Sequence, residues 1–238
     1  MFAALGRRHV VLRTALAVAG VGVFAACGSG NPAADDAQVG RGLEAIKGIP
    51  QDGSTLGDPK APWTLSVIST PTSFELDGLI TQLPALTERF VRSGRLNIQM
   101  RTPTRGPYGG NGEERAVAAA LLAAGLQDRY WDALVRFVPR YVGGVDGRDL
   151  ALLLRRAGVP DVERALRDRS STRIRSALDR ADGAAAAADG DQAKDAARQG
   201  LVFYMLTLGA DEPRFVRFVQ KGRSLTDAVA LELLRDRR

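Results

Sequence analysis

Residues 63–101 decide the fold, and they read WTLSVISTPTSFELDGLITQLPALTERFVRSGRLNIQMR. The first six, Trp63 to Ile68, are rich in β-branched and aromatic residues and follow a turn with two prolines, which predicts a buried strand. After Pro71, apolar residues recur at steps of three and four as far as Phe90, as they do on one face of a helix. Arg95 to Arg101 then alternate polar and apolar residues, which predicts a second strand. A strand, a helix and a strand of these lengths predict a right-handed βαβ unit.

Two local signals refine the predicted helix. Thr72 precedes Glu75 by three residues, the spacing of a capping box, in which the two side chains accept the free amides of the first turn. Pro84 interrupts the apolar stripe. Because proline has no N–H and its ring clashes with the carbonyl of Ile80, we expect a kink at Pro84, with the helix resuming beyond it.

Beyond residue 101, the spacing of apolar residues along the chain changes twice. From Glu113 to about Gln199 the pattern is helical, with Gly125 marking a break. Leu201 to Leu208 form an apolar run of strand length and Arg214 to Gln220 alternate, which together predict a hairpin. Ser224 is placed to cap a final helix. The predicted fold class is therefore α/β: a βαβ unit, a helical insertion at about 113–199, a β-hairpin and a C-terminal helix.

Composition excludes several classes of function. The 238 residues include 33 Lys and Arg against 27 Asp and Glu, and three of the arginines precede Cys27. The remaining 30 against 27 are too balanced to indicate a nucleic-acid partner. The only cysteine and the only histidine, Cys27 and His9, lie in the first 27 residues. The remainder of the chain therefore has no thiolate nucleophile, imidazole base or Cys/His metal site, and we expect neither a metal nor a cofactor.

The first 27 residues have the pattern of an export signal. Three arginines precede residues 14–26, an uncharged stretch of 13 apolar and small residues. That stretch is shorter than the about 20 residues that a spanning helix needs. Phe24-Ala25-Ala26-Cys27 resembles a bacterial lipobox, with Phe24 in place of the usual leucine. We interpret residues 1–27 as a lipoprotein signal peptide and expect an extracytoplasmic protein, anchored to the cell membrane by a lipid on Cys27. The alternative is ordinary signal cleavage with an incidental cysteine.

The composition also divides the exported part. Residues 28–56 are rich in Gly, Ala, Asp and Ser, which is typical of a flexible tether. Residues 57–238 contain all the strand and helix patterns described above, so we expect them to form the folded domain.

The order of elements and several stretches of sequence resemble the DsbA-like disulfide oxidoreductases. Leu56 to Leu65 is similar to that family's lead-in to its first core strand. Residues 83–86 and 90–96 are similar to its first helix and the approach to the next strand, and residues 118–134 to its Ala-rich helix and following tryptophan. The resemblance covers about residues 47–238 and implies a thioredoxin-like fold with a helical insertion.

The chain departs from that family at the reaction centre. The family's Cys-x-x-Cys falls on Ser73 to Leu76 or, in the other register, on Thr72 to Glu75, and neither quartet contains sulfur. Thr70 replaces the acidic residue before the motif, and the family's Thr-Pro dipeptide is missing near Phe203. Disulfide exchange requires a thiolate, so we expect no disulfide oxidoreductase activity. The degenerate site positions implied by the resemblance are Thr70, Ser73, Phe74, Glu75, Leu76, Tyr204 and Met205.

Two functions from different classes fit these features. The first is a non-catalytic binding module, in which a groove around Thr70–Glu75 and Tyr204–Met205 holds a peptide or a protein partner of the cell envelope. The second is a thiol transferase resembling the kappa-class glutathione transferases, with Ser73 at the helix N-terminus holding a substrate thiolate. The missing proline, Glu75 and the export signal disfavour the second. The simplest interpretation of Ser73 is a polar residue at the start of a helix.

Overall fold

The computed structural model describes most of the chain from Pro32 onward. The described residues are 32–73, 76–105, 112–138, 147–187, 203–209, 214–216 and 224–235. The helices are α1 (Pro32–Ile46), α2 (Leu76–Leu86), the π-helical turn η1 (Thr87–Val91), α3 (Gly112–Gly125), α4 (Tyr130–Phe137), α5 (Gly147–Arg156), α6 (Val162–Asp168), α7 (Thr172–Ala187) and α9 (Leu225–Arg235).

One mixed sheet forms the centre of the fold. Its strands are β1 (Gln51–Asp52), β2 (Thr55–Leu56), β3 (Trp63–Ile68), β4 (Leu96–Arg101), β5 (Phe203–Leu208) and β6 (Arg214–Val216). They lie in the order β1-β2-β4-β3-β5-β6, and β3 and β4 are parallel while the other pairs are antiparallel. The register of β3 and β4 runs from Trp63 opposite Leu96 to Ile68 opposite Arg101. The predicted α/β class and its βαβ unit are confirmed.

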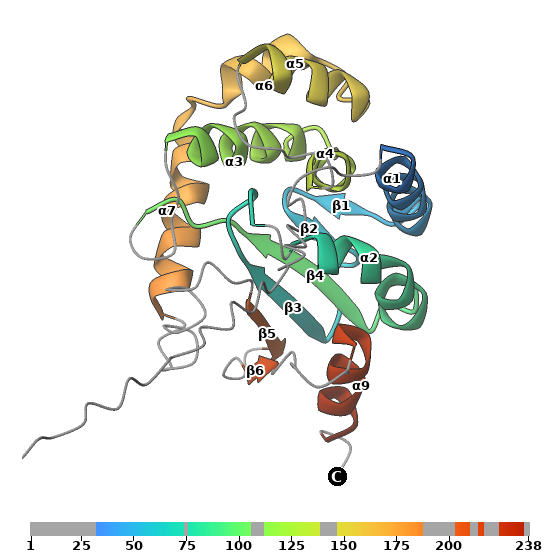
Figure 1. Cartoon of the computed structure of the whole chain (residues 1–238). Helices are drawn as coiled ribbons and strands as arrows, with labels where there is room; N and C mark the ends of the chain where they lie inside the picture. The colour runs from blue at the N-terminus through green and yellow to red at the C-terminus, as the bar shows by residue number, and fades with distance from the viewer. Residues whose placement is uncertain are drawn as a thin grey trace, which may run out of the picture.

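The helices cover the sheet and one of its ends. In Figure 1, α7 lies on one side of the strands, α2 and α9 lie on the other, and α3 to α6 gather at the top. The helices α3 to α7 occupy the interval in which an insertion was predicted, and α3 ends at Gly125 as expected. A Cβ at Gly125 would lie 3.0 Å from the carbonyl oxygen of Gly53, so only glycine allows the β1–β2 turn to approach this closely.

The irregularity at Pro84 is a widened turn. Helix α2 passes through Pro84 and continues into η1, as the apolar pattern predicted. The proline cannot donate to the carbonyl of Ile80. The Thr87 hydroxyl donates to the carbonyls of Leu83 and Pro84, at 2.8 and 3.1 Å, and the amide of Arg92 reaches back five residues to Thr87. These bonds maintain the helical path beyond the interruption.

The interval 28–56, predicted to be a flexible tether, is largely folded. Residues 32–46 form α1, which contacts α2 and α4. Its apolar residues Val39, Leu43 and Ile46 follow helical spacing, and Val39 and Ile46 are each 3% exposed. The Gly- and Ala-rich composition was misleading, because small residues also allow two helices to pack closely. The folded part therefore begins at Pro32 in the described residues, not at residue 57.

A short hairpin completes the same interval. Strands β1 and β2 flank Asp52-Gly53-Ser54-Thr55, and β2 pairs with β4. Gly53 has φ of 56°, a left-handed conformation that glycine adopts readily. The Asp-Gly dipeptide is a strong hairpin signal, and it was overlooked because only two residues on either side are in strands.

The second half of the sheet agrees with its prediction where it is described. Residues 203–208 and 214–216 form the antiparallel pair β5 and β6, and residues 217–220 of the expected second strand lie outside the described part. The Ser224 hydroxyl accepts the amide of Asp227 at 3.1 Å and thus caps α9.

Two glycines of α1 allow a matched test of its packing. A Cβ at Gly42 would lie 2.8 Å from Cγ1 of the buried Val135 in α4, whereas a Cβ at Gly40 meets nothing within 4 Å. We expect Gly40→Ala to raise the free energy of unfolding by about 0.5–1 kcal/mol, because alanine favours a helix. We expect Gly42→Ala to lower it by about 1 kcal/mol, because the α1–α4 contact is overpacked. Urea titrations followed by circular dichroism measure both, and equal gains would contradict this packing of α1.

Candidate functional site

The candidate site lies where the carboxyl ends of β3 and β4 meet the N-terminal end of α2. The pairing of the two strands extends one residue further, since the Ser69 amide donates to the carbonyl of Arg101 at 3.1 Å. A tight turn then leads into α2: the Ser73 amide donates to the Thr70 carbonyl, and the Leu76 amide donates to the Ser73 carbonyl. Residues 70–73 therefore lie over this edge of the sheet.

A chain of oxygen atoms connects this turn to the helical insertion. The hydroxyl oxygens of Thr70 and Thr72 lie 3.4 Å apart. The Thr72 hydroxyl donates to the carboxylate of Glu114, in the first turn of α3. The expected capping partner Glu75 lies outside the described residues. Glu114 thus adds a carboxylate to an edge already lined by hydroxyl groups.

The segment that follows β4 is held by residues of three helices, α3, α4 and α7. Thr102 and Thr104 are almost fully buried. The Thr102 hydroxyl lies 3.3 Å from the phenol oxygen of Tyr130, and the Thr104 hydroxyl accepts from Arg115 Nη1 at 2.7 Å. Asp182 of α7 accepts the backbone amide of Thr104 at 2.5 Å. These bonds fix the backbone on the β4 side of the site.

No family model and no curated protein matches this sequence. Solved structures do match the fold. Oxidised BdbD from Bacillus subtilis has a TM-score of 0.56 at 13% identity, over 80% of this chain and 97% of that one. DsbA from Chlamydia trachomatis has a TM-score of 0.53 at 15% identity, over 81% and 94% of the two chains.

A third match is MdbA from Corynebacterium matruchotii, a thiol-disulfide oxidoreductase. Its TM-score is 0.51 at 18% identity, over 71% of this chain and 91% of that one. The chain has the DsbA-like thioredoxin fold. The resemblance noted in the sequence is confirmed at the level of the fold. The chain has a single cysteine, Cys27, which lies far from the motif positions in the sequence, and this fits a degenerate form of the DsbA-like motif.

The degenerate motif positions fall into three groups. Thr70 and Ser73 are half-buried on the turn, at the site. Leu76, in contrast, is fully buried and packs in the core below it. Phe74 and Glu75 lie outside the described residues, as does Cys27. Among the described motif positions, Thr70 and Ser73 are therefore the ones placed to meet a ligand.

The β5 positions lie further from the site than expected. Tyr204 is opposite Val67 and is 2% exposed, while Met205 is opposite Ser66. The backbone position opposite Ile68, at the end of β3 nearest the turn, is that of Phe203. The groove residue expected at Tyr204 is thus a core residue of the sheet.

Sequence reasoning missed Glu114 and Asp182 altogether. Both lie in the interval 113–199, where the helical pattern singled out no acidic residue for the site. The one available signal was Glu113-Glu114 at the start of a helical pattern, and acids at that position are common. Their place at the site follows from the packing of α3 and α7 against this edge.

The described part offers no catalytic metal centre. No group of three or more His, Cys, Asp or Glu residues gathers within it. Burial raises the pKa of Tyr130 to about 12, although its hydrogen bond with Thr102 acts in the opposite direction. The phenol is therefore neutral at ordinary pH and can serve as a hydrogen-bond partner only. No described helix is both long and apolar enough to cross a membrane.

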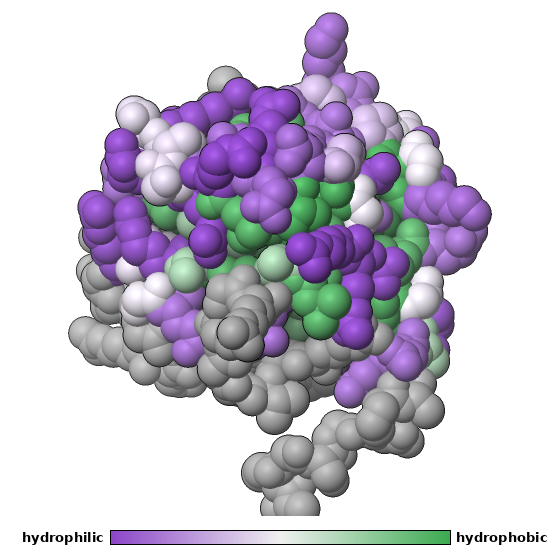
Figure 2. Space-filling view, turned by 90° about the horizontal axis from the view of Figure 1, so that it is seen from above, coloured by the Kyte–Doolittle hydropathy of each residue, from purple (hydrophilic) through white to green (hydrophobic). Residues whose placement is uncertain are grey.

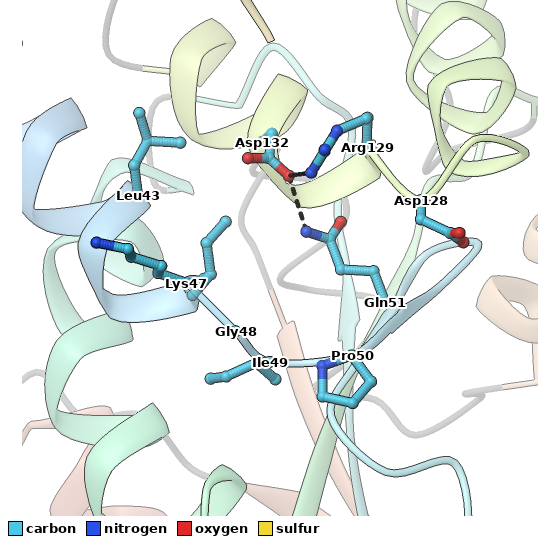
Figure 3. Close-up of a pocket in the computed structure, with 10 residues that line it drawn as sticks. Leu43, Lys47, Gly48, Ile49, Pro50, Gln51, Asp128, Arg129 and Asp132 are labelled. Atoms are coloured by element: carbon cyan, nitrogen blue, oxygen red, sulfur yellow. Dashed lines mark hydrogen bonds and ion pairs between the residues drawn. The ribbon is translucent and has the colours of Figure 1, made fainter. Parts of the chain in front are cut away.

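A hollow lies away from the site, at the C-terminal end of α1. It encloses about 560 Å³ between Leu43, Ile49, Pro50 and the α3–α4 connection (Figure 3). Asp132 accepts from Gln51 Nε2 at 2.8 Å and lies 3.7 Å from Arg129, as the dashed lines in Figure 3 mark. The side-chain oxygen Oε1 of Gln51 accepts from the backbone amide of Trp131 at 3.0 Å. These polar groups form hydrogen bonds and an ion pair with one another, and the bonds of Gln51 hold β1 against α4.

The buried phenol makes stability depend on pH in the alkaline range. Because the pKa of Tyr130 is about 12 in the folded chain and about 10 when exposed, its contribution is complete below pH 10. We expect this contribution to the free energy of unfolding, about 2–3 kcal/mol, to be lost as the pH rises from 10 to 12. Tyr130→Phe should remove the part of the alkaline loss of stability that comes from ionisation of the phenol. Urea titrations at pH 8, 10 and 11.5 measure it.

Thr102→Val is the matched control for Tyr130→Phe. It removes the same hydrogen bond, worth about 1 kcal/mol, but keeps the phenol. We expect it to retain the alkaline loss of stability. An identical pH dependence in the two variants would contradict the role assigned to Tyr130.

Proposed function

We propose that this DsbA-like protein is an exported, lipid-anchored binding module that holds a peptide or protein partner without redox chemistry. The observation that carries the proposal is the linked series Thr70, Thr72 and Glu114 at the edge of the sheet. At the corresponding edge, the oxidoreductases that the sequence resembles have cysteines. Hydroxyl and carboxylate oxygens form hydrogen bonds and ion pairs, but they cannot form a mixed disulfide.

The chemistry of this edge favours a partner that supplies donors. The Glu114 carboxylate is an acceptor only, and Thr70 and Ser73 are half-buried, so their groups can be reached from one side. Backbone amides of an extended peptide supply such donors, and so does a Lys or Arg side chain. A polypeptide with a basic residue is therefore the partner that this edge suits best.

The transferase alternative receives no support from this arrangement. A thiolate held near Ser73 would lie close to the Glu114 carboxylate, which accepts from the neighbouring Thr72. Two negative charges at such short range repel each other, and this repulsion opposes the effect of the helix N-terminus. We therefore assign Ser73 no catalytic role.

Export and lipid attachment rest on the first 27 residues. The arginines, the short apolar stretch and the lipobox-like Phe24 to Cys27 support them. An acylated Cys27 would leave the mature protein without a free thiol. The membrane location and the absence of redox chemistry are thus consistent with each other.

A photoreactive residue at Thr70 tests the binding function. We expect it to form a discrete adduct with an envelope polypeptide in intact cells, whereas the same residue at Leu152, exposed on α5, should not. Glu114→Gln should reduce the adduct about tenfold or more, because a charge-assisted hydrogen bond contributes roughly 1.5–3 kcal/mol. Thr72→Val serves as a second variant, and thermal melting checks that both are folded. Equal adducts from Thr70 and Leu152 would refute the proposed site.

Insulin reduction tests the absence of redox chemistry. With dithiothreitol as the reductant, we expect the purified mature protein to precipitate insulin no faster than the blank, because no described residue can form the required mixed disulfide. Cys27→Ser controls for any contribution from the N-terminal thiol. A rate well above the blank in both proteins would contradict a non-redox function.

A further inference from the structure

Helix α1 runs in the same direction as α2 and η1. Near its beginning, Gln38 Nε2 donates to Asp77 Oδ1 at 2.6 Å and to Thr81 Oγ1 at 3.1 Å, in the first turns of α2. Near its end, Arg92, which follows η1, donates to the carbonyls of Ala45 and Lys47 at 3.0 and 3.2 Å. The two helices therefore run parallel to each other. Figure 1 shows them side by side.

This direction places the beginning of α1 at the same end of the fold as the candidate site. Gln38 is level with the first turns of α2, and six residues of α1 precede it. At 1.5 Å per residue, Pro32 lies about 9 Å beyond that level, on the side where residues 70–73 and Glu114 lie. The end of the fold that is nearest in sequence to Cys27 is thus the end that carries the site.

The link from Cys27 to α1 is short. Only residues 28–31 separate Cys27 from Pro32. Even if fully extended, five residue steps span at most about 18 Å. A lipid on Cys27 would therefore keep the beginning of α1 close to the bilayer, whereas a tether of 28–56 would have allowed the domain to move far from it.

Acidic side chains at this end of the fold argue against direct binding to anionic lipids as the reason for the orientation of the domain. Asp35 and Asp36 lie in the first turns of α1, and Asp77 lies in the first turn of α2. Carboxylates are repelled by anionic headgroups. The outer surface at the α5 and α6 end is likewise mostly hydrophilic, with apolar residues in its hollows (Figure 2). Orientation therefore depends on the short link.

We propose that the lipid on Cys27 directs the edge carrying Thr70, Ser73 and Glu114 toward the bilayer, so that the site engages a polypeptide lying at the membrane surface. The proposal rests on the lipid attachment and binding site of the proposed function, and adds where the partner must lie. The opposite end, with η1 and the hollow beside Gln51, faces away from the membrane. A partner diffusing freely far from the bilayer would not reach the site.

Two exposed positions at the ends of the α2–η1 helix test the orientation. A Cβ at Gly78 meets nothing within 4 Å, and Ser93 is exposed just beyond η1. The fifteen residue steps from position 78 to position 93 correspond to about 22 Å along a helix. Because Cys27 is blocked when acylated, Gly78→Cys and Ser93→Cys each provide one thiol for a fluorophore. The acylated full-length product is placed in phosphatidylcholine vesicles with a headgroup-attached quencher, and we expect several-fold stronger quenching at position 78 than at 93.

A lengthened link is the control for this experiment. Insertion of about 40 Gly and Ser residues after Ser29 should make quenching equally weak at both positions, since a flexible chain releases the domain. Equal or reversed quenching in the acylated protein with its natural link would overturn the orientation. Mass spectrometry of Cys27 is performed on the same sample, and a Cys27 without a lipid would overturn the anchor itself. A failed Thr70 adduct would instead refute the binding site.

Discussion

The parallel pairing of β3 with β4 is the constraint on which the rest of the fold depends. Two parallel neighbours need a crossover, so α2 and η1 must return the chain across one face of the sheet. Both strands then end at the same edge, beside the N-terminal end of α2. The turn at residues 70–73, the segment after β4 and the first turn of α3 meet there because of this connection. The position of the site is thus a consequence of topology, and only its chemistry depends on individual side chains.

The sequence predicted those parts of the fold whose periodicity is local. Strand β3 was predicted with its observed bounds, and the helix through Pro84 was predicted to resume, because apolar spacing on each element is determined by the face that it buries. Helix α1 was missed because its few apolar residues are separated by Gly, Ala and Asp. Its stability comes from contacts with α2 and α4, which no local pattern reveals. The β1–β2 hairpin was missed because its strands have only two residues each, too few to show an alternating pattern.

The candidate site shows the same limit. Thr70 and Ser73 were identified because they occupy motif positions in continuous sequence. Glu114 lies 42 residues from Thr72, and Asp182 lies 78 residues from Thr104, so only tertiary packing reveals these contacts. The register of β5 against β3 places Tyr204 inside the sheet, whereas the resemblance had implied that it lines the groove. Residue types therefore predicted a site without the cysteines of the DsbA-like motif, but its hydrogen-bond network could be found only from the structure.

The two-residue strand β1 has a consequence for how this protein behaves at high local density. Unpaired backbone groups on a sheet margin can recruit a strand from another molecule, which is one route to aggregation. Here the margin on the β1 side is only two residues long, and the Gln51 side chain is held by both Trp131 and Asp132. A copy of the chain would find too few free donors and acceptors there to add a strand. Many copies confined to one surface could thus crowd together without polymerising through that margin.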